Sequence, residues 1–97
     1  MQHPIYKITN VRVLGYYSLE ITFSDGAKKV IDLEGILHGE MYGPLRDITL
    51  FQQVAIDPEV HTIIWPNGAD FDPAILRDWE TYKHEIEQRA RTWELVG

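Results

Sequence analysis

One alternating segment followed by a tight-turn signal restricts the fold of this chain more than any other feature. Residues 19–23 (LEITF) place three large apolar side chains on one side of an extended chain and two polar ones on the other. Ser24, Asp25 and Gly26 follow; aspartate favours turns, and glycine accepts positive φ values without a Cβ clash. The segment predicts one arm of a β-hairpin whose buried face needs a covering layer.

Segments on both sides extend this hairpin to a sheet. Residues 8–14 alternate apolar and polar side chains, which is typical of a strand, and residues 15–18 predict a turn. Residues 27–33 return with Ile31 and Leu33 on one face. We therefore predict a three-stranded antiparallel meander with one buried face.

Short elements are expected in the middle of the chain. Residues 34–39 are too few for a full helix and predict a single turn that ends at Gly39. Residues 41–45 contain glycine and proline and predict a loop. Asp47 can cap the short helix that follows, in which Leu50 and Val54 lie four residues apart.

A second strand pair is predicted after that helix. Residues 54–56 and residues 62–65 are rich in β-branched and apolar side chains, and Asp-Pro-Glu at 57–59 turns the chain between them. Pro-Asn-Gly at 66–68 ends the second strand, because proline cannot donate to the sheet and Asn-Gly prefers tight turns.

The longest predicted element is a helix over about residues 73–93, with Asp72 as its N-cap and Pro73 at its first position. Its apolar stripe, at helical spacing, contains Ile75, Leu76, Trp79, Tyr82, Ile86, Ala90 and Trp93. The chain is thus expected to form a single α+β domain over residues 1–97: a three-stranded antiparallel meander, a short helix, a second short strand pair and a long C-terminal helix.

Composition narrows the class of protein. The chain contains no cysteine, which excludes disulfides, thiolate catalysis and zinc–thiolate sites and suits a reducing, cytoplasmic location. The N-terminus lacks a signal-peptide pattern, and no apolar run approaches the roughly 18 residues of a membrane span. The net charge is −6, so we expect no binding of nucleic acid by electrostatic attraction.

Metal binding and nucleophilic catalysis are not expected. The four histidines, His3, His38, His61 and His84, include no pair one helical turn apart. Asp57, Glu59 and His61 alternate, but Pro58 places them in a turn that faces water. Neither serine lies in a Gly-x-Ser-x-Gly segment. We therefore predict no catalytic residue, metal or cofactor, although a paired-carboxylate hydrolase stays open because acidic residues are plentiful.

Several motifs follow one another in an order that resembles a known family. They are Phe23-Ser24-Asp25-Gly26, Ile31-Asp32-Leu33, Tyr42-Gly43-Pro44-Leu45-Arg46-Asp47, Leu50-Phe51, Trp65-Pro66-Asn67-Gly68-Ala69-Asp70 and Asp72-Pro73. The family is the bacterial domain of unknown function 2442, and the resemblance covers about residues 8–76. It implies a bacterial source and a small α+β fold without an established activity. Some relatives resemble antitoxin-like partners of a neighbouring small protein. Others carry a helix-turn-helix domain, whereas we expect a single helix after residue 76 here.

Two surfaces are candidates for binding. The first lies in two loops, 42–47 and 65–70, whose aromatic, amide, carboxylate and guanidinium groups could line a small polar pocket. Its members are Tyr42, Arg46, Asp47, Trp65, Asn67 and Asp70. The competing interpretation is structural: Asn67-Gly68 forms a turn, the aspartates cap helices, and Arg46 pairs with a carboxylate or carbonyl.

The second candidate is the C-terminal helix, with Trp79, Tyr82, Ile86 and Trp93 as an interface. A helix of about 30 Å is longer than a sheet of five- to six-residue strands, so Trp93, Leu95 and Val96 are expected to project past the body. We predict a non-enzymatic protein-interaction module that binds a partner protein or a second copy of itself. The alternative is a small-ligand-binding protein or small enzyme that uses the 42–47/65–70 loop surface.

Overall fold

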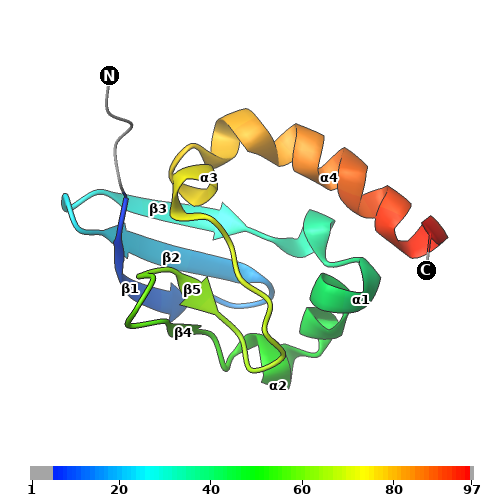
Figure 1. The fold of residues 1–97 in the computed structure, drawn as a ribbon, viewed down its shortest axis with the longest axis horizontal. Helices are drawn as coiled ribbons and strands as arrows, with labels where there is room; N and C mark the ends of the chain where they lie inside the picture. The colour runs from blue at the N-terminus through cyan, green and yellow to red at the C-terminus, as the bar shows by residue number, and fades with distance from the viewer. Residues whose placement is uncertain (1–5, 97) are drawn as a thin grey trace.

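The computed structural model describes the backbone of residues 6–96 and the side chains of residues 6–93, and confirms the α+β plan (Figure 1). The strands are β1 (Ile8–Val13), β2 (Ser18–Phe23), β3 (Lys28–Asp32), β4 (Ala55–Ile56) and β5 (Ile63–Ile64). The helices are η1 (Glu34–Ile36), α1 (Gly39–Tyr42), η2 (Gly43–Arg46), α2 (Ile48–Phe51), α3 (Pro73–Arg77) and α4 (Trp79–Val96), where η denotes a 3-10 helix.

The predicted meander is confirmed: β1, β2 and β3 form one antiparallel sheet in that order. Leu19 of β2 pairs with Val13 of β1 and Ile31 of β3, and Ile21 pairs with Val11. Leu19, Ile21 and Ile31 are fully buried, so the alternation read from the sequence identifies the inner face correctly. β4 and β5 form a separate antiparallel pair, as predicted, next to β1.

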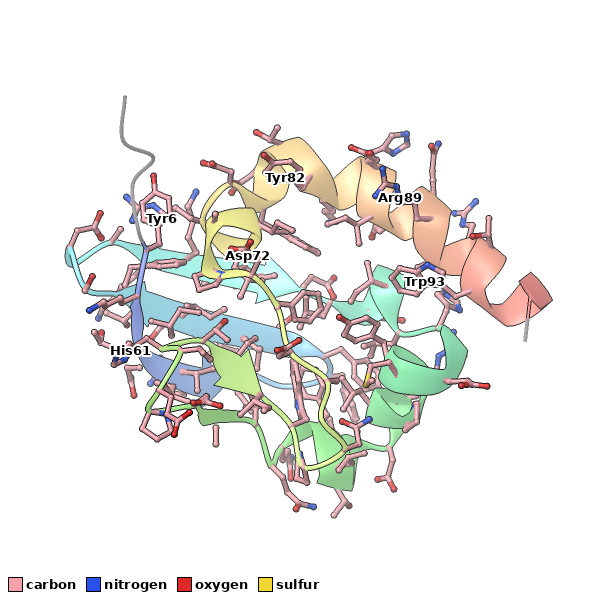
Figure 2. All side chains as sticks on the ribbon, in the orientation of Figure 1. Tyr6, His61, Asp72, Tyr82, Arg89 and Trp93 are labelled. Atoms are coloured by element: carbon pink, nitrogen blue, oxygen red, sulfur yellow. The ribbon has the colours of Figure 1, made fainter. Side chains whose placement is uncertain are left out.

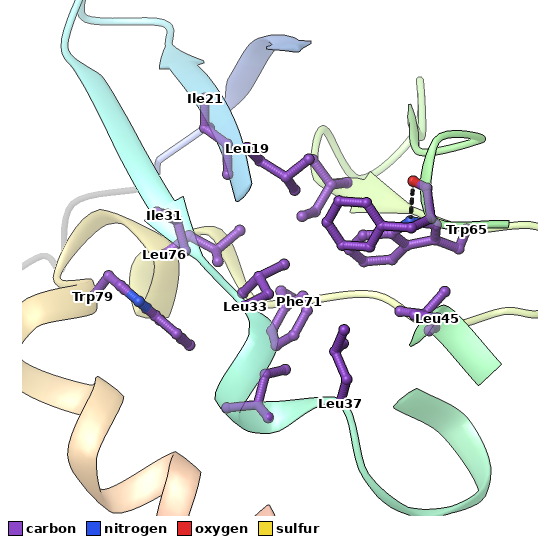
Figure 3. Packing of buried hydrophobic residues seen from close by; sticks show 14 of the residues in the cluster. Leu19, Ile21, Ile31, Leu33, Leu37, Leu45, Trp65, Phe71, Leu76 and Trp79 are labelled. Carbon is purple, nitrogen blue, oxygen red and sulfur yellow. Dashed lines mark hydrogen bonds between the residues drawn. The ribbon is translucent and has the colours of Figure 1, made fainter. Parts of the chain in front are cut away.

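The core lies between the inner face of the sheet and the helices and loop that cover it (Figure 3). Leu76 of α3 and Trp79 of α4 supply the helical side of this core. Trp65 enters it from the loop after β5 and is only 2% exposed. The Trp65 indole N–H donates to the carbonyl oxygen of Phe51 at 2.9 Å, so its polar atom is satisfied inside the core.

The C-terminal region departs from prediction because it contains two helices rather than one. The Asp72 carboxylate accepts from the Ala74 N–H at 2.8 Å and Pro73 is the first helical residue, so the predicted cap is confirmed. However, α3 ends at Arg77, because the φ of −105° and ψ of 38° at Asp78 leave the helical region. The break lets Arg77 stay paired with Asp25 of the β2–β3 turn while α4 crosses to η1 and α1.

Residues 34–46 also differ from prediction. Gly39 does not end a helical turn; it begins α1, with a φ of +80° after an extended His38. The predicted loop at 41–45 is wrong, because α1 and η2 cover it with consecutive helical turns. Pro44 suits the first turn of η2, where its missing N–H needs no partner. These turns widen the body beyond the end of the sheet.

The second half of α4 packs on this widened body. Ala90 is fully buried, and a Cβ built on Gly39 would lie 2.8 Å from the Trp93 Cβ, so α4 approaches α1 closely. The expectation that Trp93 projects past the body is therefore wrong, because α1 provides a surface the sequence did not reveal. The side chains of Leu95 and Val96 lie outside the described residues. None of the described helices is long and apolar enough to cross a membrane.

Candidate functional site

One groove brings residues of both candidate surfaces together. Its volume is about 280 Å³, and we call it the α4 groove. One wall consists of Tyr42, residues 70–72 and Ile75, and the other of Ile86, Arg89 and Trp93 on α4. Figure 2 shows Trp93 directed from α4 toward the body of the molecule.

Aromatic rings form the apolar part of the α4 groove. Tyr42 stacks on Phe71, with ring centroids 5.0 Å apart and an interplanar angle of 24°. The Tyr42 centroid also lies 5.5 Å from that of Trp93, at an interplanar angle of 32°. The Tyr42 hydroxyl donates to the Asp70 carbonyl oxygen at 2.9 Å, which fixes α1 to the loop before α3. The rings are therefore held in place by the fold itself.

Negative charge lies beside these rings. Burial and then the nearby Asp70 carboxylate raise the pKa of Tyr42 above its ordinary value. Within the described part of the chain, the Asp70 carboxylate has no hydrogen-bond or ion-pair partner. Arg89 is the one basic residue among the described residues that line the groove, and it pairs with Glu85 at 2.6 Å. The groove thus combines exposed aromatic surface with a carboxylate that is not neutralised within the described chain.

Arg46 and Asp47 lie away from the α4 groove. The Arg46 Nε donates to the Leu37 carbonyl oxygen at 2.6 Å, and a terminal guanidinium nitrogen lies 2.9 Å from His38 Nδ1. Arg46 lines a separate depression of about 450 Å³ together with Tyr17, whose hydroxyl donates to the Arg46 carbonyl oxygen. Asp47 accepts from the Thr49 N–H at 2.9 Å and caps α2, as predicted.

Asn67 and Trp65 hold structure together rather than line the groove. The Asn67 side chain donates to the Met41 carbonyl oxygen and accepts from the Ala69 N–H, which fastens the turn after β5 to α1. Trp65 lies in the core. Of the six residues in the predicted loop surface, the structure therefore brings only Tyr42 and Asp70 to the α4 groove.

The comparison with protein families places the chain in one family. A family model described as "Protein of unknown function (DUF2442)" matches residues 8–82, which is most of the chain. The chain belongs to this family. No curated protein and no solved structure matches the chain.

The DUF2442 match includes only one wall of the α4 groove. Tyr42, residues 70–72 and Ile75 lie within the matched residues, whereas Ile86, Arg89 and Trp93 come after them. The match extends to residue 82, whereas the motifs that carry the resemblance cover about residues 8–76. One wall of the groove therefore belongs to the family core, and the other is added by the later turns of α4.

The predicted interface helix is only partly available for contact. Trp79 is 4% exposed and belongs to the core, and Tyr82 is 38% exposed on the outer side of α4 (Figure 2). Ile86 and Trp93 remain half-buried and line the groove. Sequence reasoning missed Phe71 and Arg89; an aromatic residue between two aspartates was the available signal for Phe71.

Among the side chains of residues 6–93, no group of three or more His, Asp or Glu is placed to hold a metal ion. The Asp57 carboxylate accepts from the N–H groups of Glu59 and Val60, so this segment forms a turn. His3 lies outside the described residues.

Proposed function

We propose that this DUF2442 chain is a non-enzymatic interaction module that binds a partner protein through the α4 groove. The observation that supports it is the convergence of Tyr42 and Asp70 with Ile86 and Trp93 in one groove. Aromatic side chains such as tryptophan and tyrosine are frequent anchors of protein interfaces. A partner could bury the remaining surface of these rings without rearranging the fold.

Binding fits the polar groups of the groove better than catalysis does. The Tyr42 hydroxyl is engaged with the Asp70 carbonyl oxygen, and the Asp72 carboxylate caps α3. Acid–base catalysis needs a titratable group positioned toward a substrate, often with a pKa shifted toward neutrality. The alternative of a small-ligand site shared by residues 42–47 and 65–70 has less support, because their side chains are divided between three places.

The finer features of the proposal rest on the sequence. We propose an antitoxin-like arrangement with a small neighbouring protein in the bacterial cytoplasm, as the family resemblance suggests. A net charge of −6 favours encounter with a basic partner, and a chain without cysteine suits a reducing compartment. A second copy of the chain is the competing occupant of the groove.

Purification at native expression tests this proposal. The tagged chain, a Trp93→Ala variant and a Tyr82→Ala control are purified from the source bacterium, and companions are measured by mass spectrometry and light scattering. Tyr82 lies on the same helix but outside the groove, so its loss should leave binding unchanged. We expect one stoichiometric companion with the wild type and with Tyr82→Ala, and its loss with Trp93→Ala.

Other results of this purification would contradict the groove as the binding surface or change its occupant. A companion that binds all three proteins equally contradicts the role of the groove, provided that circular dichroism shows the Trp93→Ala variant to be folded. A homodimer that dissociates in Trp93→Ala identifies a second copy as the occupant. A monomer without a companion contradicts the interaction module.

A further inference from the structure

The fold already contains one site that holds an arginine side chain. The Arg77 guanidinium lies 5.0 Å from the ring centroid of Tyr6 and 5.2 Å from that of Phe23. The same guanidinium pairs with the Asp25 carboxylate at 2.8 Å. A carboxylate and two aromatic rings together thus hold one cationic side chain, through an ion pair and cation–π attraction.

The α4 groove presents the same set of groups, two aromatic rings and a carboxylate, and the arginine in its lining, Arg89, is engaged by another carboxylate. Tyr42 and Trp93 supply two rings 5.5 Å apart, and Asp70 supplies the carboxylate beside Tyr42. Both rings are only half-buried, so part of their surface is open to a partner. Arg89 lines the same groove, but its guanidinium is paired with Glu85.

We infer that the α4 groove takes a basic segment of a partner protein, with one arginine or lysine side chain seated between Asp70 and the rings of Tyr42 and Trp93. This inference rests on the proposed function and specifies the chemistry of the partner. Arginine suits the site better than lysine, because its planar guanidinium stacks on rings and pairs with a carboxylate at the same time.

Apolar side chains beside the carboxylate extend the recognition to a short segment. Ile75 of α3 and Ile86 of α4 both line the groove and pack against the core. An aliphatic residue next to the partner's arginine would bury its surface there. The segment that fits is therefore an arginine flanked by aliphatic residues, rather than a run of basic residues.

A peptide titration followed by NMR tests this inference on the full chain. The probes are acetyl-Leu-Arg-Leu-amide and the same peptide with citrulline, which keeps the shape of arginine but has no charge. The reporter is the indole N–H signal of Trp93, assigned by its loss in Trp93→Phe. We expect saturable shifts with the arginine peptide and at least about threefold weaker binding of the citrulline peptide.

Two variants that each lose one negative charge distinguish the role of the groove carboxylate from the effect of a lower net charge. Asp70→Asn removes the groove carboxylate, and Glu59→Gln removes an exposed carboxylate from the turn between β4 and β5. We expect Asp70→Asn to weaken binding about fivefold and Glu59→Gln to leave it nearly unchanged. Equal binding of both peptides, or equal loss in both variants, overturns the inference.

Purification at native expression distinguishes failure of this inference from failure of the proposed interaction module. If the companion depends on Trp93 but binds Asp70→Asn as tightly as the wild type, the interaction module stands and the basic segment is wrong. If no companion is found, the module fails, while the peptide titration still decides whether the groove recognises arginine.

Discussion

The three tryptophans show how one residue type serves three roles in this chain. Trp65 is buried with its indole N–H bonded to the Phe51 carbonyl oxygen. Trp79 is also buried, but its indole nitrogen has no hydrogen-bond partner among the described residues. Trp93 is half-buried and lines the α4 groove. The sequence shows only that all three are large and apolar; their polar atoms acquire different roles from their surroundings.

The first prediction compares the two buried tryptophans. Trp65→Phe leaves the Phe51 carbonyl oxygen without its donor, whereas Trp79→Phe removes a donor that had no partner. Both substitutions remove the same ring atoms. We therefore expect Trp65→Phe to lower the free energy of unfolding by about 1–2 kcal/mol more than Trp79→Phe does. Urea unfolding followed by circular dichroism measures the difference. Equal losses of unfolding free energy in the two variants would mean that the Trp65 hydrogen bond makes no net contribution to stability.

At the scale of elements, the packing of α4 on α1 depends on a glycine. Gly39 has a φ of +80°, and an added Cβ would lie 2.8 Å from the Trp93 Cβ. Gly26, in the β2–β3 turn, has a similar φ of +89° but no atom within 4 Å of an added Cβ. Both positions therefore require a positive φ, but a helix approaches closely only at Gly39.

The second prediction uses this difference. Gly26→Ala should cost about 1 kcal/mol of unfolding free energy, because only the positive φ is strained. Gly39→Ala should cost at least about 2 kcal/mol, because it strains the backbone and also pushes α4 away. The Trp93 indole signal should move in Gly39→Ala alone. If both variants lose the same stability and leave that signal in place, α4 does not press on Gly39.

At the scale of the whole molecule, two ion pairs fasten the C-terminal helices to the sheet. Arg77 of α3 pairs with Asp25 at 2.8 Å, and Glu80 of α4 pairs with Lys29 of β3 at 3.2 Å. The Ala27 N–H and then Arg77 hold the pKa of Asp25 below its ordinary value. A backbone hydrogen bond of Glu80 itself, and then Lys29, hold the pKa of Glu80 below its ordinary value.

The third prediction is acid sensitivity. Because folding lowers these two pKa values, the carboxylates stabilise the fold above their unfolded pKa values, ordinarily 3.8 for Asp25 and 4.5 for Glu80. That stability is lost as the pH falls through their lower folded pKa values. Asp25→Asn should therefore be less stable than the wild type at pH 7 and lose less stability on acidification. Urea unfolding at several pH values measures this, with Glu59→Gln as the charge control.

Local features of the sequence determined much of the fold. The alternation at 19–23 gave the inner face of the sheet, and the Asp-Gly turn joined β2 to β3. The caps at Asp47 and Asp72 were also correct, because a cap depends on neighbours two residues away. The family and its small α+β plan followed from motifs within this core.

Contacts between distant residues decided the rest. The break at Asp78, the helical turns at 39–46 and the burial of Ala90 all depend on how α4 meets segments some 50 residues earlier in the chain. The α4 groove has the same origin, because Tyr42 and Trp93 face each other only after α4 docks on α1. Periodicity and capping are local and can be read along the chain, whereas a groove forms where two surfaces fail to fill the space between them, and this depends on tertiary packing.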